Sequence, residues 1–169
     1  MLRHHILVIG DRQIGKSSFC LQLVENKFTK TYICTIFPEQ YHLKIKKHLL
    51  VFYDTPGNER FHIGLEPKYI KSDIAILFVN EESEIEEWFQ RVKRWAPLIS
   101  WIVVANTSSN KGKEWANKHN IPFNVINVQT KEGFDDVIQQ ILNLTQFHAS
   151  RSTGLSLRTQ DEEYHHYCT

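Results

Sequence analysis

One short segment constrains the fold of this 169-residue chain more than any other. It reads Gly10-Asp11-Arg12-Gln13-Ile14-Gly15-Lys16-Ser17, and it stands between an apolar run at 6–9 and a helical pattern over 16–24. The spacing GxxxxGK[ST] between a strand and a helix is that of a phosphate-binding loop. Its four fixed positions arise by chance roughly once in tens of thousands of starting points, so a plain glycine-rich turn is the weaker alternative. The sequence therefore predicts a site for a nucleoside triphosphate.

The residue types in this loop explain what it binds. Gly10 and Gly15 allow the backbone to approach phosphate oxygens, and successive N–H groups at a helix N-terminus point toward the anion. Lys16 is placed to reach the β and γ phosphates, and the Ser17 hydroxyl is placed to ligate Mg²⁺. The residues predicted to bind the phosphates and the metal ion are Asp11, Arg12, Gln13, Ile14, Gly15, Lys16, Ser17 and Ser18.

Composition limits the classes of protein to which the chain can belong. Twenty basic and 19 acidic residues give a formal net charge of +1, so no overall field attracts nucleic acid or an anionic membrane. The three cysteines, Cys20, Cys34 and Cys168, lack the spacing of a disulfide framework or a zinc site. We therefore expect a reducing, cytoplasmic location. We also expect a chain without a signal peptide or transmembrane segment.

Alternating patterns along the chain predict an α/β fold. We expect one domain over 1–147 and a polar, disordered tail over 148–169. Predicted strands lie at 6–9, 74–79, 101–105 and 124–126, with a hairpin over 43–53 that turns near 46–48. Predicted helices lie at 16–24, 83–95, 113–119 and 134–147. This order favours a P-loop NTPase fold, with a doubly wound, mostly parallel six-stranded sheet flanked by helices and the ligand at the carboxyl ends of the strands.

Further motifs in the same order resemble those of the Ras superfamily of small GTPases, most closely its Rab branch, over about residues 5–147. Phe28 and the segment Tyr32-Ile33-Cys34-Thr35-Ile36 match the first switch of that family. The segment Asp54-Thr55-Pro56-Gly57-Asn58-Glu59-Arg60-Phe61 resembles the second switch, usually DTAGQERF in Rab proteins. The resemblance implies GTP or GDP with Mg²⁺, a base stacked on Phe28 beside Tyr32, and a γ-phosphate sensed by Thr35 and Gly57. It implies Ser17, Thr35 and Asp54 as the metal site.

The base-recognition motifs depart from the family pattern. Asn106-Thr107-Ser108-Ser109 stands where the family has NKxD, so Ser109 replaces the carboxylate that accepts hydrogen bonds from guanine. Asn127-Val128-Gln129 stands where the family has its second base-contacting loop. Losing a charge-assisted hydrogen bond costs about 1.5–3 kcal/mol. The resemblance thus implies Asn106, Thr107, Ser109, Val128 and Gln129 around the base, with the preference for guanine weakened.

The catalytic residues implied by the resemblance are Asn58, Gly57, Lys16 and Arg12. Asn58 stands where the family has the glutamine that orients the attacking water. The asparagine side chain is one C–C bond, about 1.5 Å, shorter than that of glutamine. Arg12 replaces a small residue of the phosphate-binding loop. Its guanidinium either crowds the water-positioning group, stabilises charge in the transition state, or points into solvent. We expect slow GTP hydrolysis.

Partners are expected at the two switches, over residues 32–41 and 55–70. Phe37 and Pro38 make the first of these edges unlike that of ordinary Rab proteins. Cys168 fits neither of the common C-terminal prenylation patterns, so we expect no lipid anchor. We also expect a monomer with no nucleic-acid partner. The main alternative is a nucleotide-binding scaffold without useful hydrolysis or with relaxed base specificity. A small P-loop kinase is the weaker alternative, because no arginine-bearing lid segment is present.

Overall fold

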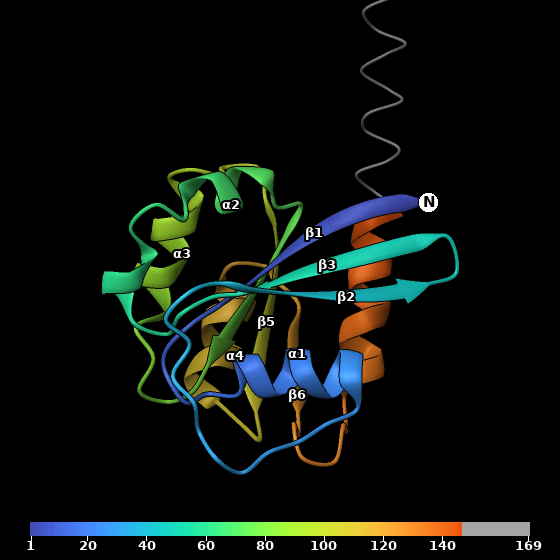
Figure 1. Ribbon diagram of the computed structural model, residues 1–169. Coiled ribbons are helices and arrows are strands. Elements are labelled where there is room, and N and C mark those ends of the chain that lie inside the picture. The colour runs from blue at the N-terminus through green and yellow to red at the C-terminus, as the bar shows by residue number, and fades with distance from the viewer. Residues whose placement is uncertain (147–169) are drawn as a thin grey trace, which may run out of the picture.

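The computed structural model describes residues 1–146 and contains one six-stranded sheet with the order β2-β3-β1-β4-β5-β6 (Figure 1). All neighbouring strands are parallel except β2 and β3, which are antiparallel. The strands are β1 Leu2–Ile9, β2 Glu39–Ile45, β3 His48–Asp54, β4 Ile74–Val79, β5 Ser100–Asn106 and β6 Phe123–Ile126. The predicted α/β fold with a mostly parallel sheet is confirmed.

Helices cover both faces of this sheet. They are α1 Lys16–Glu25, α2 Glu66–Lys71, α3 Ile85–Lys93, α4 Asn110–Lys118 and a last helix at 134–146, with a short 3-10 turn at Glu59–His62. In Figure 1, α1 lies beside the orange last helix, whereas α2 and α3 lie on the other side of the strands. The helices at 16–24, 83–95 and 134–147 are confirmed within a few residues at their ends, and residue 147 lies outside the described part.

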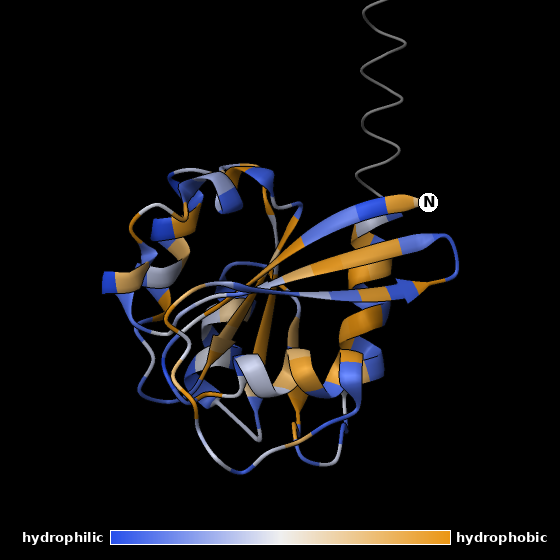
Figure 2. Cartoon of the chain, viewed as in Figure 1, coloured by the Kyte–Doolittle hydropathy of each residue, from blue (hydrophilic) through white to orange (hydrophobic). Residues whose placement is uncertain are grey.

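The period-two alternation of the buried strands divides the core into two clusters. Ile6 and Val8 of β1 face the cluster that contains Phe19 of α1. Leu7 and Ile9 face the opposite cluster, which contains Trp88 of α3. β4 is hydrophobic along its whole length (Figure 2), and its residues are buried on both faces of the sheet, as expected for a central parallel strand. The sheet is therefore a rigid platform whose carboxyl-terminal edge carries the loops.

Several elements differ from the sequence-based expectation. The α2 helix, Glu66–Lys71, was not predicted, and β2 begins at Glu39 rather than residue 43. β1 begins at Leu2 rather than residue 6, because its polar first half pairs in register with β3 from Leu2 opposite His48 onward. The α4 helix begins at Asn110 rather than residue 113. The hairpin between β2 and β3 is confirmed, with Lys46 in the left-handed conformation at its turn.

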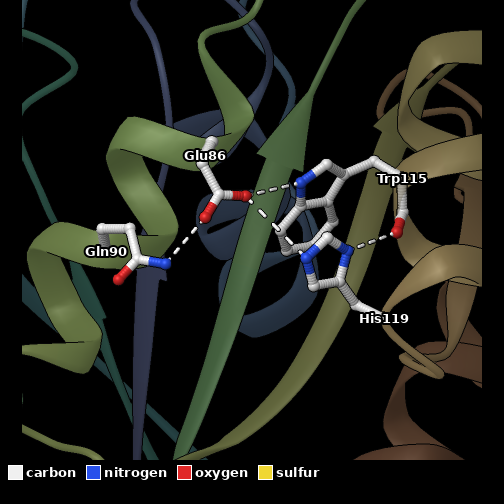
Figure 3. A network of polar contacts seen from close by, with 4 residues as sticks. All are labelled: Glu86, Gln90, Trp115 and His119. Carbon is white, nitrogen blue, oxygen red and sulfur yellow. Dashed lines mark hydrogen bonds and ion pairs between the residues drawn. The ribbon is translucent and has the colours of Figure 1, made fainter.

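A polar network joins α3 to α4 (Figure 3). The Glu86 carboxylate accepts hydrogen bonds from Trp115 Nε1 at 3.0 Å and from Gln90 Nε2 at 2.7 Å. The pKa of Glu86 is lowered, chiefly by the Gln90 hydrogen bond. His119 stacks on Trp115, with ring centroids 3.9 Å apart, and lies 3.8 Å from the same carboxylate. These contacts fix α4 against α3, and with it the loop that enters α4.

The predicted tail, 148–169, and with it Cys168, lies outside the described residues. Within residues 1–146, no helix has the length and the hydropathy that crossing a membrane requires.

Gly10 sets how the chain leaves β1. Its φ is +135°, and a Cβ at this position would lie 2.4 Å from the carbonyl oxygen of Phe78. Only glycine combines that backbone conformation with so close an approach to β4. The phosphate-binding loop therefore begins pressed against the neighbouring strand.

We predict that Gly10→Ala destabilises the fold by about 3–5 kcal/mol, because backbone strain and a steric clash add together. Gly64→Ala is the matched control, since Gly64 also has a positive φ, +85°, but a Cβ added there would meet no other part of the protein within 4 Å. The control should lose only about 1–2 kcal/mol. Urea denaturation of the two variants measures both values, and equal losses would contradict the close approach to β4.

Candidate functional site

A cavity of about 450 Å³ opens at the carboxyl ends of β1 and β3. This volume is within the range of sites for small molecules. It brings together many of the residues that the sequence predicted for the ligand: Arg12, Gln13, Ile14, Gly15, Lys16, Ser17, Ser18, Phe28, Tyr32, Thr35, Gly57, Asn106 and Val128. The cavity lies where the ligand of a doubly wound fold is expected.

The loop between β1 and α1 holds a buried lysine at its centre. Lys16 is 6% exposed, and its Nζ donates a hydrogen bond to the Asp11 carbonyl at 2.6 Å. Burial lowers the pKa of Lys16 to about 8, although Asp54 and Asp11 offset part of this effect. The ammonium group is thus largely charged at neutral pH but poorly solvated, which favours binding of an anion beside it.

Three oxygen-bearing side chains meet behind this lysine. The Ser17 hydroxyl donates to Asp54 Oδ2 at 2.5 Å and lies 3.0 Å from Thr35 Oγ1. Asp54 Oδ1 is buried and has no hydrogen-bond partner. Burial also raises the pKa of Asp54 to about 6, with the Ser17 hydrogen bond acting in the opposite direction. Two hydroxyls beside a carboxylate oxygen without a partner fit a hard cation such as Mg²⁺.

Asn106 ties three segments together at the end of β5. Its Oδ1 accepts a hydrogen bond from the Val128 N–H at 3.1 Å. A Cβ on Gly15 would lie 3.3 Å from Val128 and 3.4 Å from Asn106 Nδ2, so the phosphate-binding loop packs against both residues. Asn106 therefore positions the loops around the cavity as well as lining it.

Three of the predicted base-contacting residues do not line the cavity. Thr107 is exposed and has a φ of +83°, a strained conformation for a β-branched side chain. Gln129 is exposed beside the cavity wall. Ser109 is 4% exposed, and its hydroxyl accepts from the Gly112 N–H at 2.9 Å as the N-cap of α4. A serine before a helical pattern is a start signal, which explains why α4 begins earlier than expected.

The second switch lies directly against the phosphate-binding loop. A Cβ on Gly57 would lie 2.6 Å from the backbone of Arg12, so no larger residue fits there. Arg12 itself is exposed at the cavity mouth. Asn58 does not line the cavity, because its Oδ1 accepts from the Arg60 N–H at 3.0 Å and caps the 3-10 turn.

Two residues outside the predicted set hold these loops. Trp88 of α3 donates from Nε1 to Asp11 Oδ1 at 2.7 Å, so Asp11 supports the loop from outside the cavity. The His62 ring packs 5.0 Å from the Trp88 ring. Neither contact leaves a signal in the sequence, because Trp88 lies 77 residues from Asp11.

Comparison with known proteins identifies the family of this chain. The Ras family matches residues 5–146. Ras-related protein SEC4 of Candida albicans is 27% identical, over 83% of this chain and 76% of that protein. GTP-binding protein ypt1 of Schizosaccharomyces pombe is 28% identical, over 70% and 68%, and Ras-related protein Rab-21 of Mus musculus is 32% identical, over 53% and 41%. The predicted resemblance to the Ras superfamily and to Rab-type proteins is confirmed, and the chain belongs to the Ras family of small GTPases.

Proposed function

We propose that this chain is a molecular switch that binds GTP and GDP with Mg²⁺ and hydrolyses GTP slowly. The cluster of Ser17, Thr35 and Asp54 carries this proposal, because it gathers metal-binding oxygens around a carboxylate oxygen that lacks a partner. Lys16 supplies the charge for the β and γ phosphates beside that cluster. Membership of the Ras family and the relatives' names support the assignment to guanine nucleotides.

The ligands of the proposed metal ion come from three separate segments. Ser17 lies in the first turn of α1, Asp54 ends β3, and Thr35 lies in the largely exposed loop between α1 and β2. When bound, Mg²⁺ would neutralise charge on the β and γ phosphates. The Thr35 hydroxyl pairs with that of Ser17, which ties this loop to the metal cluster. Loss of the γ-phosphate would therefore release the first switch more easily than the rest of the site.

The two switches present hydrophobic side chains to solvent. Ile33 is 78% exposed, Phe37 is 79% exposed and Ile63 is 88% exposed. Exposed large apolar side chains on both switches favour a protein partner. We expect an effector or regulator to contact residues 32–41 and 55–70. The monomeric state and the cytoplasmic location of the protein stay predictions.

An anchor limits how much of the second switch can move. His62 is 3% exposed, and its Nε2 donates to the Pro56 carbonyl, whereas its Nδ1 pairs with the Tyr69 hydroxyl of α2. Pro56 and His62 are thus joined across the loop between them. The segment free to respond to the γ-phosphate is then confined to residues 57–61.

Slow hydrolysis follows from Asn58 and Arg12. The Asn58 amide must leave its cap on Arg60 before it can orient a water, and it is about 1.5 Å shorter than glutamine. Arg12 lies at the cavity mouth, and Gly57 packs on its backbone, so an arginine side chain that turned into the cavity would compete with the attacking water for space. We favour crowding by Arg12 over charge stabilisation.

A second candidate is a nucleotide-binding scaffold without useful hydrolysis. The cap that Asn58 makes on Arg60 favours it, because this hydrogen bond directs the amide away from the cavity. Both candidates share the phosphate and metal site, so hydrolysis separates them.

We predict that Asp54→Asn weakens Mg²⁺-dependent binding of GTP by about 10–100-fold, because one charge-assisted ligand is lost. Calorimetric titration with and without Mg²⁺ measures this effect. The nucleotide-free variant should remain folded, since burying ionised Asp54 is unfavourable at pH 7. Asp73→Asn is the control, because Asp73 bonds the His5 N–H outside the cavity. No binding of GTP or GDP by the wild type would refute the proposed function.

We predict that Asn58→Gln raises single-turnover GTP hydrolysis by about tenfold or more, because a displacement of about 1 Å can cost about a hundredfold. Asn58→Ala is the control and should not accelerate the reaction. Rapid quenching and phosphate detection give both rates. A Gln variant no faster than the wild type would favour the scaffold.

We predict that acid destabilises the wild type more than His62→Gln. Burial lowers the pKa of His62 from 6.5 to about 4, so between these values the unfolded chain binds a proton that the folded chain does not. Stability is therefore lost as the pH falls, by up to about 3 kcal/mol near pH 4. Asp54 has a raised pKa and acts in the opposite direction, but this effect is the same in both proteins and cancels. Urea unfolding at several pH values tests the difference, and identical pH dependence would contradict a neutral, buried His62.

A further inference from the structure

The base end of the cavity differs in kind from its phosphate end. Guanine is distinguished from adenine by hydrogen bonds to its edge, where its oxygen accepts and its amino group donates. A site that forms such bonds rejects the wrong partner by a factor of about 10⁴–10⁵, whereas a site that offers shape alone separates similar molecules weakly. The polar groups near the base therefore decide the specificity. In this chain the Ser109 hydroxyl and the Val128 N–H already form hydrogen bonds within the protein.

Ser109 cannot read a base while it caps α4. Its hydroxyl accepts from the Gly112 N–H at 2.9 Å, and its carbonyl accepts from the Lys113 N–H at 3.1 Å. The N–H groups of Asn110 and Lys111 donate to the Glu81 carboxylate. All four N–H groups of the first turn thus have partners. The start of α4 is satisfied without a ligand.

Packing also prevents this turn from sliding toward the cavity. A Cβ on Gly112 would lie 2.5 Å from Val79 Cγ2 and 3.3 Å from the Phe123 ring. The helix thus begins in direct contact with β4 and β6. The network of Glu86 and Trp115 holds the same helix on its other side (Figure 3). Moving Ser109 to the base would disrupt both contacts.

The donors of the opposite loop are engaged as well. The Val128 N–H donates to Asn106 Oδ1 at 3.1 Å, although this N–H is the group that a base oxygen would need. The next two N–H groups, of Gln129 and Thr130, donate to Asn127 Oδ1 at 2.9 and 3.2 Å. Asn106 thus satisfies the donor of Val128, which lines the cavity, and Asn127 satisfies the next two donors of the loop.

What remains at this end is apolar surface and the amide of Asn106. Its Oδ1 is engaged by the Val128 N–H, and its Nδ2 is a donor that can pair with ring N7, an acceptor that guanine and adenine share. Phe28 and Val128 line the cavity beside Leu21. Among residues 1–146, the carboxylate in the cavity lining is that of Glu39, which accepts from the Tyr41 hydroxyl and raises the pKa of Asp54, so it lies toward the metal end. Stacking on an aromatic ring stabilises any purine, because every base has a π-face.

We infer that the base subsite accepts purine nucleotides without selecting guanine over adenine. This inference rests on the proposed nucleotide site and widens its range of ligands, because affinity then comes from the phosphates, the metal ion and stacking. The dissociation constants for GTP and ATP should lie within about tenfold of each other, far below the ratio of a site that reads the edge. ITP, which lacks the amino group of guanine, should bind as well as GTP.

The test is titration of GTP, ITP and ATP with Mg²⁺ into nucleotide-free full-length chain. Ratios within about tenfold support the inference. GTP binding more than about tenfold tighter than ATP would overturn it and leave the nucleotide switch intact. Absence of binding by all three would overturn the proposed function and the inference together. Lys16→Ala should abolish binding of all three alike, because the phosphate contact is shared.

Two variants at position 109 test the reason for the lost specificity. Ser109→Asp keeps an N-cap, since aspartate caps helices as well as serine, and it should leave the ratio of GTP to ATP affinity within about twofold of the wild type. Ser109→Ala removes the cap and should lower the midpoint of unfolding, and it should leave the ratio of GTP to ATP affinity unchanged. If Ser109→Asp raises the ratio by tenfold or more, residue 109 reaches the base, and the explanation that the α4 cap keeps it from the base is wrong.

Discussion

The hydrogen bond from Ser17 to Asp54 is the contact on which the site depends. It joins the first turn of α1 to the last residue of β3 at 2.5 Å, and Thr35 reaches the same hydroxyl from the first switch. Three segments distant in the sequence therefore converge on one carboxylate. Its second oxygen is buried without a partner, so the cost of burying this charge is not fully recovered within the protein.

The buried charges of this site make a ligand favourable. The pKa of Lys16 is lowered to about 8 and that of Asp54 is raised to about 6, both chiefly by burial. Each shift corresponds to a free energy of about 3 kcal/mol that disfavours the charged form of the side chain. Because the two groups attract each other, these two free energies do not add. A metal ion at the carboxylate and phosphates at the lysine would replace the lost solvation. The protein thus gives up stability at this site that binding restores.

Much of the fold could be predicted from the sequence because its signals are local. The strand and helix on either side of the glycine motif and the strand at 74–79 depend on neighbouring residues, and all three were predicted correctly. Phosphate binding by the loop stays a prediction. The early start of α4 was missed although Ser109 carries a helix-start signal. The contacts of Trp88 with Asp11 and of His62 with Pro56 and Tyr69 leave no local signal, because they depend on where α3 and α2 pack.

The proposed function and the inference on the base together imply that a shared fold can retain one half of a site and alter the other. The phosphate end needs Gly10, Gly15 and Lys16, and each is fixed by backbone conformation or burial. The base end needs only donors and acceptors, which other parts of the protein can engage at little cost. Ser109 stabilises α4 and Asn127 stabilises its own loop, so under the inference above the same side chains would serve the fold and be withheld from the base. The response of a switch to its γ-phosphate does not require selection of the base, since Thr35 and Gly57 lie at the opposite end. The two properties can therefore diverge independently on this fold.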